Sequence, residues 1–358
     1  MDSAVWLPFA GLGAGVVLGY AARRTHFCTL SALERHWYAG DSSGLRTWVL
    51  AAAAAIGLTQ LLAGAGVIEP AASFYLDPSF GWAGAIAGGL MFGFGMALVG
   101  TCGFGALVRL GGGSLRGLIV LVVLGLAGLA AQRGLIAPLR QATESATSIR
   151  LAAAPDQSLG SIASSLAGFD AGALVTIVVV CALCAFVFAD RSFRRQRGRI
   201  IAAIAIGAAI TAGWVATSIA AATSFSPIQV ESASFVVPVA DVIMLLGIHT
   251  GGAMPDYGVA VVFGTVIGAA LAAWQRRDMR WEACDDAREL GRHLGGAVLM
   301  GIGGVFALGC TIGQGLSAAS LLAVSAPVVM LSIAAGARLG LAYLIEGSLL
   351  AALGRPAE

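Results

Sequence analysis

The stretch GGLMFGFGMALVGTCGFG, from Gly88 to Gly105, can be aligned without a gap with GAVLMGIGGVFALGCTIG, from Gly296 to Gly313. On this alignment Cys102 falls on Cys310. Glycines fall on glycines at the other matched positions, which are Gly88, Gly93, Gly95 and Gly105 on Gly296, Gly301, Gly303 and Gly313. In a chain with 50 glycines some coincidence is expected, but a cysteine in the same register indicates a duplication.

Composition places this duplication in a membrane. Apolar residues make up 58% of the chain and charged residues 11%, and the mean hydropathy is +0.88. A water-soluble domain carries about 25% charged residues. Since each helical span needs about 20 apolar residues, we expect an all-α integral membrane protein with about nine transmembrane helices in the lipid bilayer. The net charge of +2 and the scattered arginines argue against a nucleic-acid partner.

Nine apolar windows support this count and suggest how the chain is organised. They lie near 5–22, 46–66, 82–101, 115–136, 172–189, 200–220, 257–274, 294–311 and 325–350. We interpret residues 1–358 as a single transmembrane domain. Residues 1–136 form a first repeat, 137–199 a connector with one transmembrane helix, and 200–354 a second repeat. An odd connector reverses the second half, which predicts a pseudo-two-fold inverted repeat.

A weaker echo pairs THFC, from Thr25 to Cys28, with TSFS, from Thr223 to Ser226. The second copy has serine where the first has cysteine. If the echo is real, the second repeat is the less complete copy.

Loop charges predict the orientation of the chain. The runs from Arg191 to Arg199 and from Arg276 to His293 carry five arginines each, whereas residues 221–256 carry none. Because cytoplasmic loops are enriched in arginine and lysine, we expect the N-terminus on the outer side and the C-terminus in the cytoplasm. Arg140 and Arg150 would then lie on the outer side, against the rule.

The two cysteine motifs, GTCGFG and GCTIGQG, are too rich in glycine to continue an ordinary helix. Broken helices are tolerated at membrane depth only where protein or a water-filled cavity covers them. A helix that restarts after such a break presents unpaired N–H groups, which attract an anion. The alternative is that the glycines only allow close helix packing, and for Gly89 and Gly93 we favour it.

The thiols at these breaks suit a ligand with a soft, polarisable end, because a thiol is both a weak donor and a weak acceptor. Cys28, Cys102 and Cys310 all lie at expected helix breaks. Cys181 and Cys184 instead lie within an unbroken apolar run, without the basic neighbour that a redox pair needs. The four scattered histidines show no metal-ligand spacing, so we expect neither a metal nor a cofactor.

At these motifs the sequence resembles the YeeE/YedE family of bacterial sulfur-transport membrane proteins. The matching stretches are RTHFCTLSALE (Arg24 to Glu34), GGLMFGFGMALVGTCGFGALVRLGGGSLRG (Gly88 to Gly117), LMGIGGVFALGCTIGQGLSAAS (Leu299 to Ser320) and, more loosely, PDYGVAVVFGTVIGA (Pro255 to Ala269). The resemblance implies nine transmembrane helices plus short re-entrant helices in a bacterial inner membrane, so that the expected outer side, with the N-terminus, is the periplasm. It also implies that Cys28, Cys102 and Cys310 relay thiosulfate inward through S–H···S contacts, often with a cytoplasmic sulfur carrier of the TusA type.

We therefore expect a permease, not an enzyme, that imports thiosulfate or a similar small sulfur anion. Besides the three cysteines, the expected substrate path contains Gly100, Thr101, Gly103, Gly105, Gly309, Thr311, Gly313, Gln314 and His26. The alternatives are a membrane thiol-disulfide redox protein that uses Cys181 and Cys184, a transporter of another sulfur or selenium species, and an ion or water channel. The long Ala/Ser-rich segment from Gln141 to Gly168 departs from other family members, which leaves the substrate open.

Overall fold

The computed structural model describes residues 5–150, 155–224, 227–247, 255–283 and 286–346. Helices dominate these ranges. Their only sheet is an antiparallel pair of three-residue strands, β1 (Ser79–Gly81) and β2 (Ser148–Arg150), in which Phe80 lies opposite Ile149. The prediction of an all-α membrane protein is thus confirmed.

Long helices in the described ranges coincide with all nine apolar windows. They are α1 (Leu7–Thr25), α3 (Ser43–Gly64), α4 (Trp82–Val99), α6 (Leu115–Gln132), α9 (Gly172–Phe188), α11 (Arg197–Thr223), α13 (Tyr257–Arg276), α14 (Ala287–Phe306) and α15 (Ser325–Glu346). In those same ranges, 6 helices are long and apolar enough to cross a membrane, α4 being counted together with the helix that follows it. That all nine cross the membrane therefore stays a prediction.

Shorter helices connect the long ones or interrupt them. They are α2 (Thr29–Ala39), α5 (Gly103–Gly111), α7 (Ala137–Thr147), α8 (Leu159–Ala167), α10 (Arg191–Arg194) and α12 (Val237–Gly247), with the 3₁₀ turns η1 (Pro70–Ala72) and η2 (Phe74–Leu76) and the π-helix η3 (Gly313–Ala318). Of these, α5 begins one residue after Cys102 and η3 three residues after Cys310, within the motifs where the sequence predicts broken helices.

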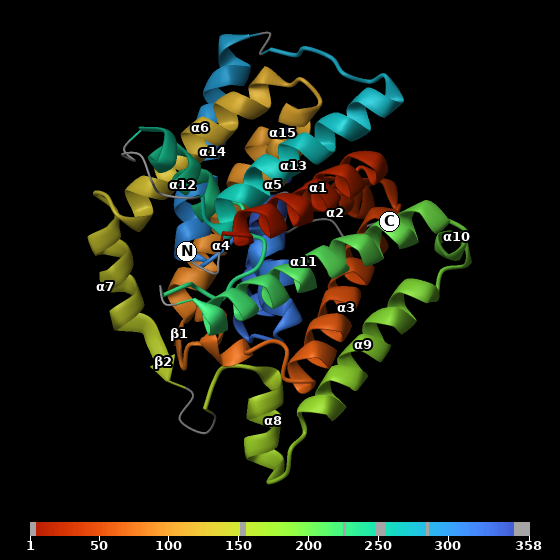
Figure 1. Cartoon of the computed structure of the whole chain (residues 1–358). Coiled ribbons are helices and arrows are strands. Elements are labelled where there is room, and N and C mark those ends of the chain that lie inside the picture. Colours follow the sequence, from red (N-terminus) through yellow and green to blue (C-terminus); the bar gives the residue numbers. More distant parts are fainter. Residues whose placement is uncertain (1–4, 151–154, 225–226, 248–254, 284–285, 347–358) are drawn as a thin grey trace.

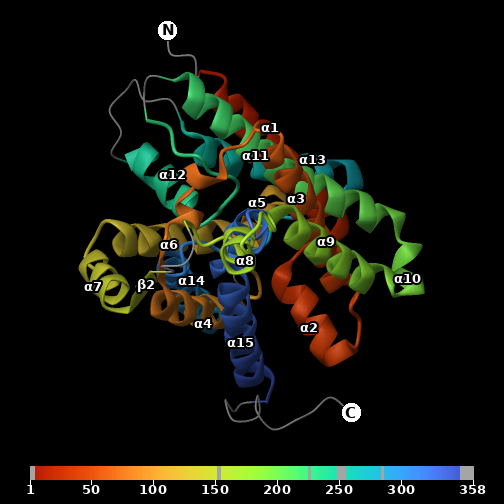
Figure 2. The same ribbon diagram turned by 90° about the horizontal axis from the view of Figure 1, so that it is seen from below.

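Two groups of long helices lie side by side (Figure 2). In one group α1 packs on α11 and α13, while α3 packs on α11 and α9. In the other, α4 packs on α14 and α15, and α6 packs on α14. The short helix α5 contacts α13 and α6, and η3 contacts α3, α11 and α15, so both helix breaks lie where the two groups meet (Figure 1).

Glycine allows the closest of these helix contacts. A Cβ atom on Gly93 of α4 would lie 2.0 Å from the carbonyl oxygen of Ile333 in α15. A Cβ atom on Gly19 of α1 would lie equally close, 2.0 Å, to the carbonyl oxygen of Thr265 in α13. Because a backbone carbonyl cannot move away as a side chain can, both positions require glycine for packing. This agrees with the packing role favoured for Gly93.

The helix contacts occur in corresponding pairs. The α1–α13 contact corresponds to the α11–α3 contact, and the α4–α15 contact corresponds to the α14–α6 contact. Such pairing is what a two-fold relation between residues 1–136 and 200–354 would produce, and it supports the predicted repeat. The connector, 137–199, contains α7 to α10 as well as β2, which pairs with β1.

The second copy of the weaker echo, Thr223 to Ser226, is only partly described, since Phe225 and Ser226 lie outside the described residues. The short helix that packs on α13 as α2 packs on α3 is α12. It begins at Val237, two residues after Phe235, just as α2 begins two residues after Phe27. Phe235 therefore occupies the position before α12 that Phe27 occupies before α2.

Large apolar side chains cover the outside of the helices. On α6, for example, Leu118, Val122 and Leu126 are 43%, 43% and 51% exposed and recur every four residues, so they form one outward stripe. A continuous apolar surface of this kind is costly in water and natural in lipid. Together with the apolar helices, it makes this a multi-pass membrane protein.

The arginine-rich loops meet at one end of the helices. Arg276 donates a hydrogen bond to the carbonyl oxygen of Arg24 at 3.1 Å, and Arg46 lies 3.6 Å from Asp190. At the other end, Arg133 lies 3.9 Å from Asp241. Residues 1–4 and 347–358, and with them both termini, lie outside the described residues. The orientation in the membrane therefore stays a prediction.

Candidate functional site

Each of the two repeated cysteines follows the end of a long helix. Helix α4 ends at Val99, and Gly100 then adopts the left-handed conformation, with φ 77°. Helix α14 ends at Phe306, and Leu308 has φ 54°. After each cysteine the chain becomes helical again, in α5 from Gly103 and in the 311–320 segment that contains η3. The two predicted helix breaks are present.

The two cysteines cap the helices that follow them in the same way. The backbone N–H of Gly105 donates to Cys102 Sγ at 3.5 Å, and that of Gly313 donates to Cys310 Sγ at 3.5 Å. The carbonyl oxygens of the two cysteines accept from the residues four positions later, each at 2.8 Å. Because each sulfur accepts a backbone hydrogen bond, its S–H remains available to donate elsewhere.

The two capped turns adjoin each other. The hydroxyl group of Thr311, the residue after Cys310, lies beside the Cys102 thiol. Thr311 is 0% exposed, and its hydroxyl makes no hydrogen bond with the described residues. A buried hydroxyl without a hydrogen-bond partner is costly unless a ligand or water satisfies it part of the time.

Cys28 completes the cluster from a third segment. It is the residue directly before α2. Its Sγ lies 4.0 Å from Oγ1 of Thr101, the residue before Cys102. Thr101, Cys102 and Cys310 are 2%, 1% and 0% exposed, whereas Cys28 is only partly buried. The structure thus brings all three cysteines together, as the sequence analysis expects.

Among the glycines expected to line the path, Gly105 and Gly313 have the most restrictive surroundings. A Cβ atom at Gly313 would lie 2.8 Å from the Ser234 hydroxyl and 3.0 Å from the Tyr75 hydroxyl. At Gly105 it would meet the Thr101 hydroxyl at 2.0 Å, whereas at Gly103 the nearest atom, in Leu124, is 3.3 Å away. Gly105 and Gly313 thus make room for polar groups that surround the cysteine turns.

Gln314 has a structural position within the second break. Its side-chain amide donates to the carbonyl oxygen of Ala307 at 2.8 Å, and its side-chain oxygen accepts from the Ser325 hydroxyl at 3.2 Å. Gln314 is 0% exposed. It therefore satisfies backbone left unpaired where α14 ends and joins that end to the start of α15. A contact between Gln314 and the substrate stays a prediction.

Residues of two connecting segments pack beside the capped turns without any signal in the sequence. Phe235 packs on Phe104 with ring centroids 4.8 Å apart, and the Phe235 backbone and the Ser234 hydroxyl both approach Cys310. Tyr75 points its buried hydroxyl toward Ser234 without forming a hydrogen bond among the described residues. These residues lie in stretches without helical periodicity, and no motif distinguishes them.

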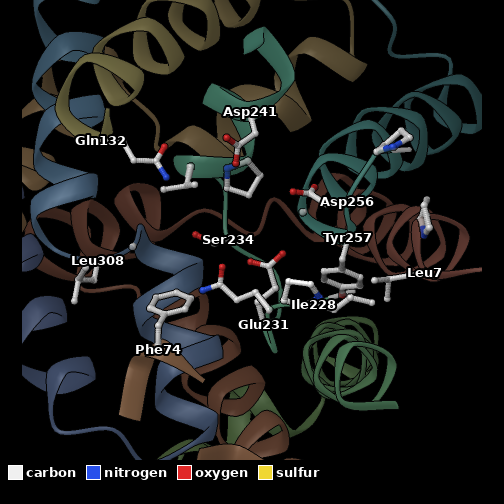
Figure 3. Close-up of a pocket in the computed structure, with 18 of the residues that line it drawn as sticks. Leu7, Phe74, Gln132, Ile228, Glu231, Ser234, Asp241, Asp256, Tyr257 and Leu308 are labelled. Carbon is white, nitrogen blue, oxygen red and sulfur yellow. The ribbon is translucent and has the colours of Figure 1, made fainter. Parts of the chain in front are cut away.

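A cavity of about 750 Å³ opens onto this segment (Figure 3). Ser234 and Gly309 line it, next to Cys310, and carboxyl groups line it from separate segments. Glu231 precedes α12, Asp241 lies within α12, and Asp256 caps α13. Burial raises the pKa of the Glu231 carboxyl to about 8, and the negative charges of Asp256 and Asp241 add to the shift. Glu231 lies between α11 and α12, outside the candidate membrane spans.

A smaller cavity of about 190 Å³ reaches the cluster from the arginine-rich end. Cys28 and His26 line it together with Arg35 and Arg199. His26 has φ 55° and ends α1, so the chain turns there before it reaches Cys28. His26 thus lies in the wall of this cavity close to Cys28, and a role for it in the substrate path stays a prediction.

Cys181 and Cys184 lie apart from the cluster. Both are on α9, a helix that packs on α3 at the edge of its group (Figure 1). Cys181 is exposed and Cys184 is partly exposed, so this face of α9 is directed outward. In a membrane an outward apolar face contacts lipid.

A helical membrane protein in which a buried polar cluster separates two cavities at opposite ends has the architecture of a permease. Helix α1 shows the arrangement, because Leu7 lines the large cavity while Thr25, 18 positions later, lines the small one. Such a helix rises about 1.5 Å per residue, so its ends lie a large part of the membrane thickness apart. The cysteine cluster lies between these cavities.

The chain belongs to the sulphur transport family, whose pattern matches residues 24–339. It is also similar to the thiosulfate transporter TsuA of Escherichia coli (strain K12), with 24% identity over 329 residues, 86% of each chain. The resemblance found at the glycine-cysteine motifs is thereby confirmed. The protein is a membrane transporter of sulfur anions and not an enzyme.

Proposed function

We propose that this transporter imports thiosulfate by passing it along Cys310, Cys102 and Cys28. Three observations support the proposal. The thiols form one cluster, a cavity reaches the cluster from each end, and the similar Escherichia coli protein is named a thiosulfate transporter. The matched capping of Cys102 and Cys310 is the observation that carries the relay, because it leaves both S–H groups free to donate.

Each transfer would exchange one weak contact for another. The terminal sulfur of thiosulfate accepts an S–H···S contact from one thiol and then from the next, and no covalent bond forms or breaks. The negative oxygen end is offset by the N–H groups at the start of α5 and of the 311–320 segment. A hydroxyl group lies at each transfer. That of Thr311 lies beside Cys102, which receives the substrate from Cys310, and that of Thr101 lies beside Cys28, which receives it from Cys102.

The arginine-rich end would face the cytoplasm of a bacterial inner membrane. The large cavity, with Glu231, Asp241 and Asp256, would then face the periplasm, with the N-terminus on the periplasmic side and the C-terminus in the cytoplasm. The proposal includes the inverted repeat of residues 1–136 and 200–354, which the corresponding helix contacts support. A cytoplasmic carrier of the TusA type is a proposed partner that would remove the imported sulfur, and co-purification with such a carrier tests it.

The main alternative is a thiol-disulfide protein that uses Cys181 and Cys184. The position of these residues on the outward face of α9 places them away from the cavities and from the other cysteines. A different sulfur or selenium anion is the second alternative, because the cluster recognises a soft end and a negative charge and neither is unique to thiosulfate.

Uptake of radiolabelled thiosulfate by a bacterium that lacks its own sulfur-uptake systems tests the proposal. Cells with the intact chain should accumulate the label and grow on thiosulfate as sole sulfur source. Cys102→Ala should abolish both, while Cys181→Ala, a matched replacement on α9, should abolish neither. Well-expressed intact protein that gives no uptake would exclude thiosulfate. Loss of function in Cys181→Ala alone would favour the redox alternative, and competition by unlabelled selenium or sulfur anions ranks the other substrates.

A further inference from the structure

A third cavity, of about 380 Å³, lies at the arginine-rich end and has no role in the relay described so far. Thr101, whose hydroxyl contacts Cys28, forms part of its wall. The rest of the wall comes from the ends of α1 and α4, from α5 and the start of α6, and from the start of α14 with Glu282 in the loop before it. The cavity therefore adjoins the cysteine cluster on the side opposite to the large cavity.

The lining of this cavity is mainly basic. Four arginines line it, against two glutamates, and they are Arg23, Arg109, Arg116 and Arg292 against Glu282 and Glu289. Arg116 is held by Glu289, with Nη1 2.6 Å from Oε1. Arg23 lies 3.3 Å from Asp278. The described residues hold no ion pair for Arg109 or Arg292, so positive charge remains.

Arg109 and Arg292 reach the cavity from different elements. Arg109 lies on α5 and donates one hydrogen bond, from Nη2 to the carbonyl oxygen of Gly100 at 2.8 Å. Arg292 lies on α14 and is exposed. Since a guanidinium group has five N–H donors, both side chains retain donors for an oxyanion.

His293 provides a second, independent indication of a ligand site. It is 6% exposed and lines the cavity, and its Nδ1 is buried without a hydrogen-bond partner among the described residues. Its Nε2 lies 4.0 Å from Glu289, too far for a hydrogen bond. A buried ring nitrogen is costly to leave unpaired, and an anion or its bound water in the cavity would satisfy it.

From this cavity, its basic lining and the unpaired His293 nitrogen, we infer a binding site for a doubly charged oxyanion such as sulfate or thiosulfate. The site is formed by Arg109, Arg292 and His293 beside Thr101. It rests on the proposed function for its role, which is to receive the anion that leaves Cys28 and Thr101 before release into the cytoplasm. The large cavity has no such positive excess, because Asp241, Asp256 and Glu231 line it together with Arg133 and Arg140, so anion binding is concentrated at the release end.

Sulfate is the probe, because it has the charge and oxygens of the substrate but no terminal sulfur for the cysteines. Binding of radiolabelled sulfate to the purified full-length protein should be saturable. Arg292→Ala should weaken it by about tenfold, the loss of one charge-assisted contact. Arg288→Ala is the matched control, since Arg288 is an exposed arginine one turn earlier on α14 that does not line the cavity. Equal weakening by both variants, or no saturable binding, would overturn the site.

The role in release has its own measurement. In vesicles with the arginine-rich end inside, sulfate loaded inside should slow thiosulfate uptake, and Arg292→Ala should relieve this inhibition where Arg288→Ala does not. Inhibition that is equal in all three proteins would contradict a release role. If the intact protein imports no thiosulfate, the proposed function fails, while sulfate binding that depends on Arg292 still establishes the site.

Discussion

The thiol of Cys28 lies 4.0 Å from the hydroxyl of Thr101, although 73 positions separate the two residues in the chain. This contact joins the start of α2 to the break between α4 and α5. It also brings the least buried of the three clustered cysteines next to Cys102, which is 1% exposed. Thr101 is therefore the neighbour through which a ligand at Cys102 would reach Cys28.

Replacing Thr101 by valine should slow thiosulfate uptake by roughly five- to tenfold. Valine keeps the shape of threonine but removes the hydroxyl, which is worth about 1 kcal/mol as a hydrogen-bonding group. Thr101→Ser should retain most of the activity because it keeps the hydroxyl. Initial uptake rates in cells with equal expression provide the measurement, and equal rates for the valine and serine variants would show that the hydroxyl has no part in transport.

Cys102→Ser should separate folding from transport. Serine is a better helix cap than cysteine, so its hydroxyl can accept the Gly105 N–H and the protein should remain as stable as the intact chain. Uptake should nevertheless fall by about tenfold or more, because a hydroxyl lacks the polarisable sulfur that the substrate contacts. Thermal unfolding in detergent and uptake are measured on the same preparations. Unchanged uptake would refute a sulfur-specific role for this position.

Uptake should fall as the external pH rises through about 8. Burial, with Asp256 and Asp241 nearby, raises the pKa of Glu231 to about 8. Below that pH the carboxyl is protonated and neutral; above it the carboxyl ionises and adds negative charge to a cavity that must admit an anion.

A variant without this charge tests the assignment. Glu231→Gln should make uptake independent of pH across this range, whereas Glu69→Gln, which alters an exposed carboxylate that does not line the cavity, should leave the fall in place. The pH profile of initial uptake distinguishes them. A fall that persists in Glu231→Gln would assign the titration to another group.

Two glycines of the stretch from Gly88 to Gly105 should respond differently to replacement by alanine. Gly93→Ala places a Cβ atom 2.0 Å from the Ile333 carbonyl oxygen, so α4 and α15 must separate, at a cost of about 3 kcal/mol. Gly100 has open space around it but φ 77°, so Gly100→Ala carries only the left-handed strain of about 1 kcal/mol. Thermal unfolding in detergent should show the larger decrease for Gly93→Ala, and the reverse order would contradict the packing role.

The long helices were predictable because the membrane imposes a simple rule of length and apolarity. All nine windows coincide with helices in the described ranges, and the glycines around Cys102 and Cys310 correctly indicate where α4 and α14 end. The length rule does not decide which helices cross the membrane. Helix α9, for example, has 17 residues and is shorter than the six candidate spans.

The surroundings of the cysteines could not be predicted. Tyr75 and Ser234 belong to segments that appear in the sequence as outer loops, yet they return to the interior and pack against Gly313. Extended segments of this kind are held by tertiary contacts, such as the bond from the Thr217 hydroxyl to the Glu231 carbonyl oxygen at 2.8 Å. They show no periodicity from which burial can be inferred.

The burial of the central turns has a further consequence for the cell. Thr101, Cys102, Cys310 and Thr311 are each at most 2% exposed, and they lie between the cavities at the two ends. Side chains packed this closely leave little room for a continuous file of water along which protons could hop. In the proposed inner-membrane location, such a layer would let a cell hold many copies of the transporter without dissipating the electrochemical gradient that drives ATP synthesis.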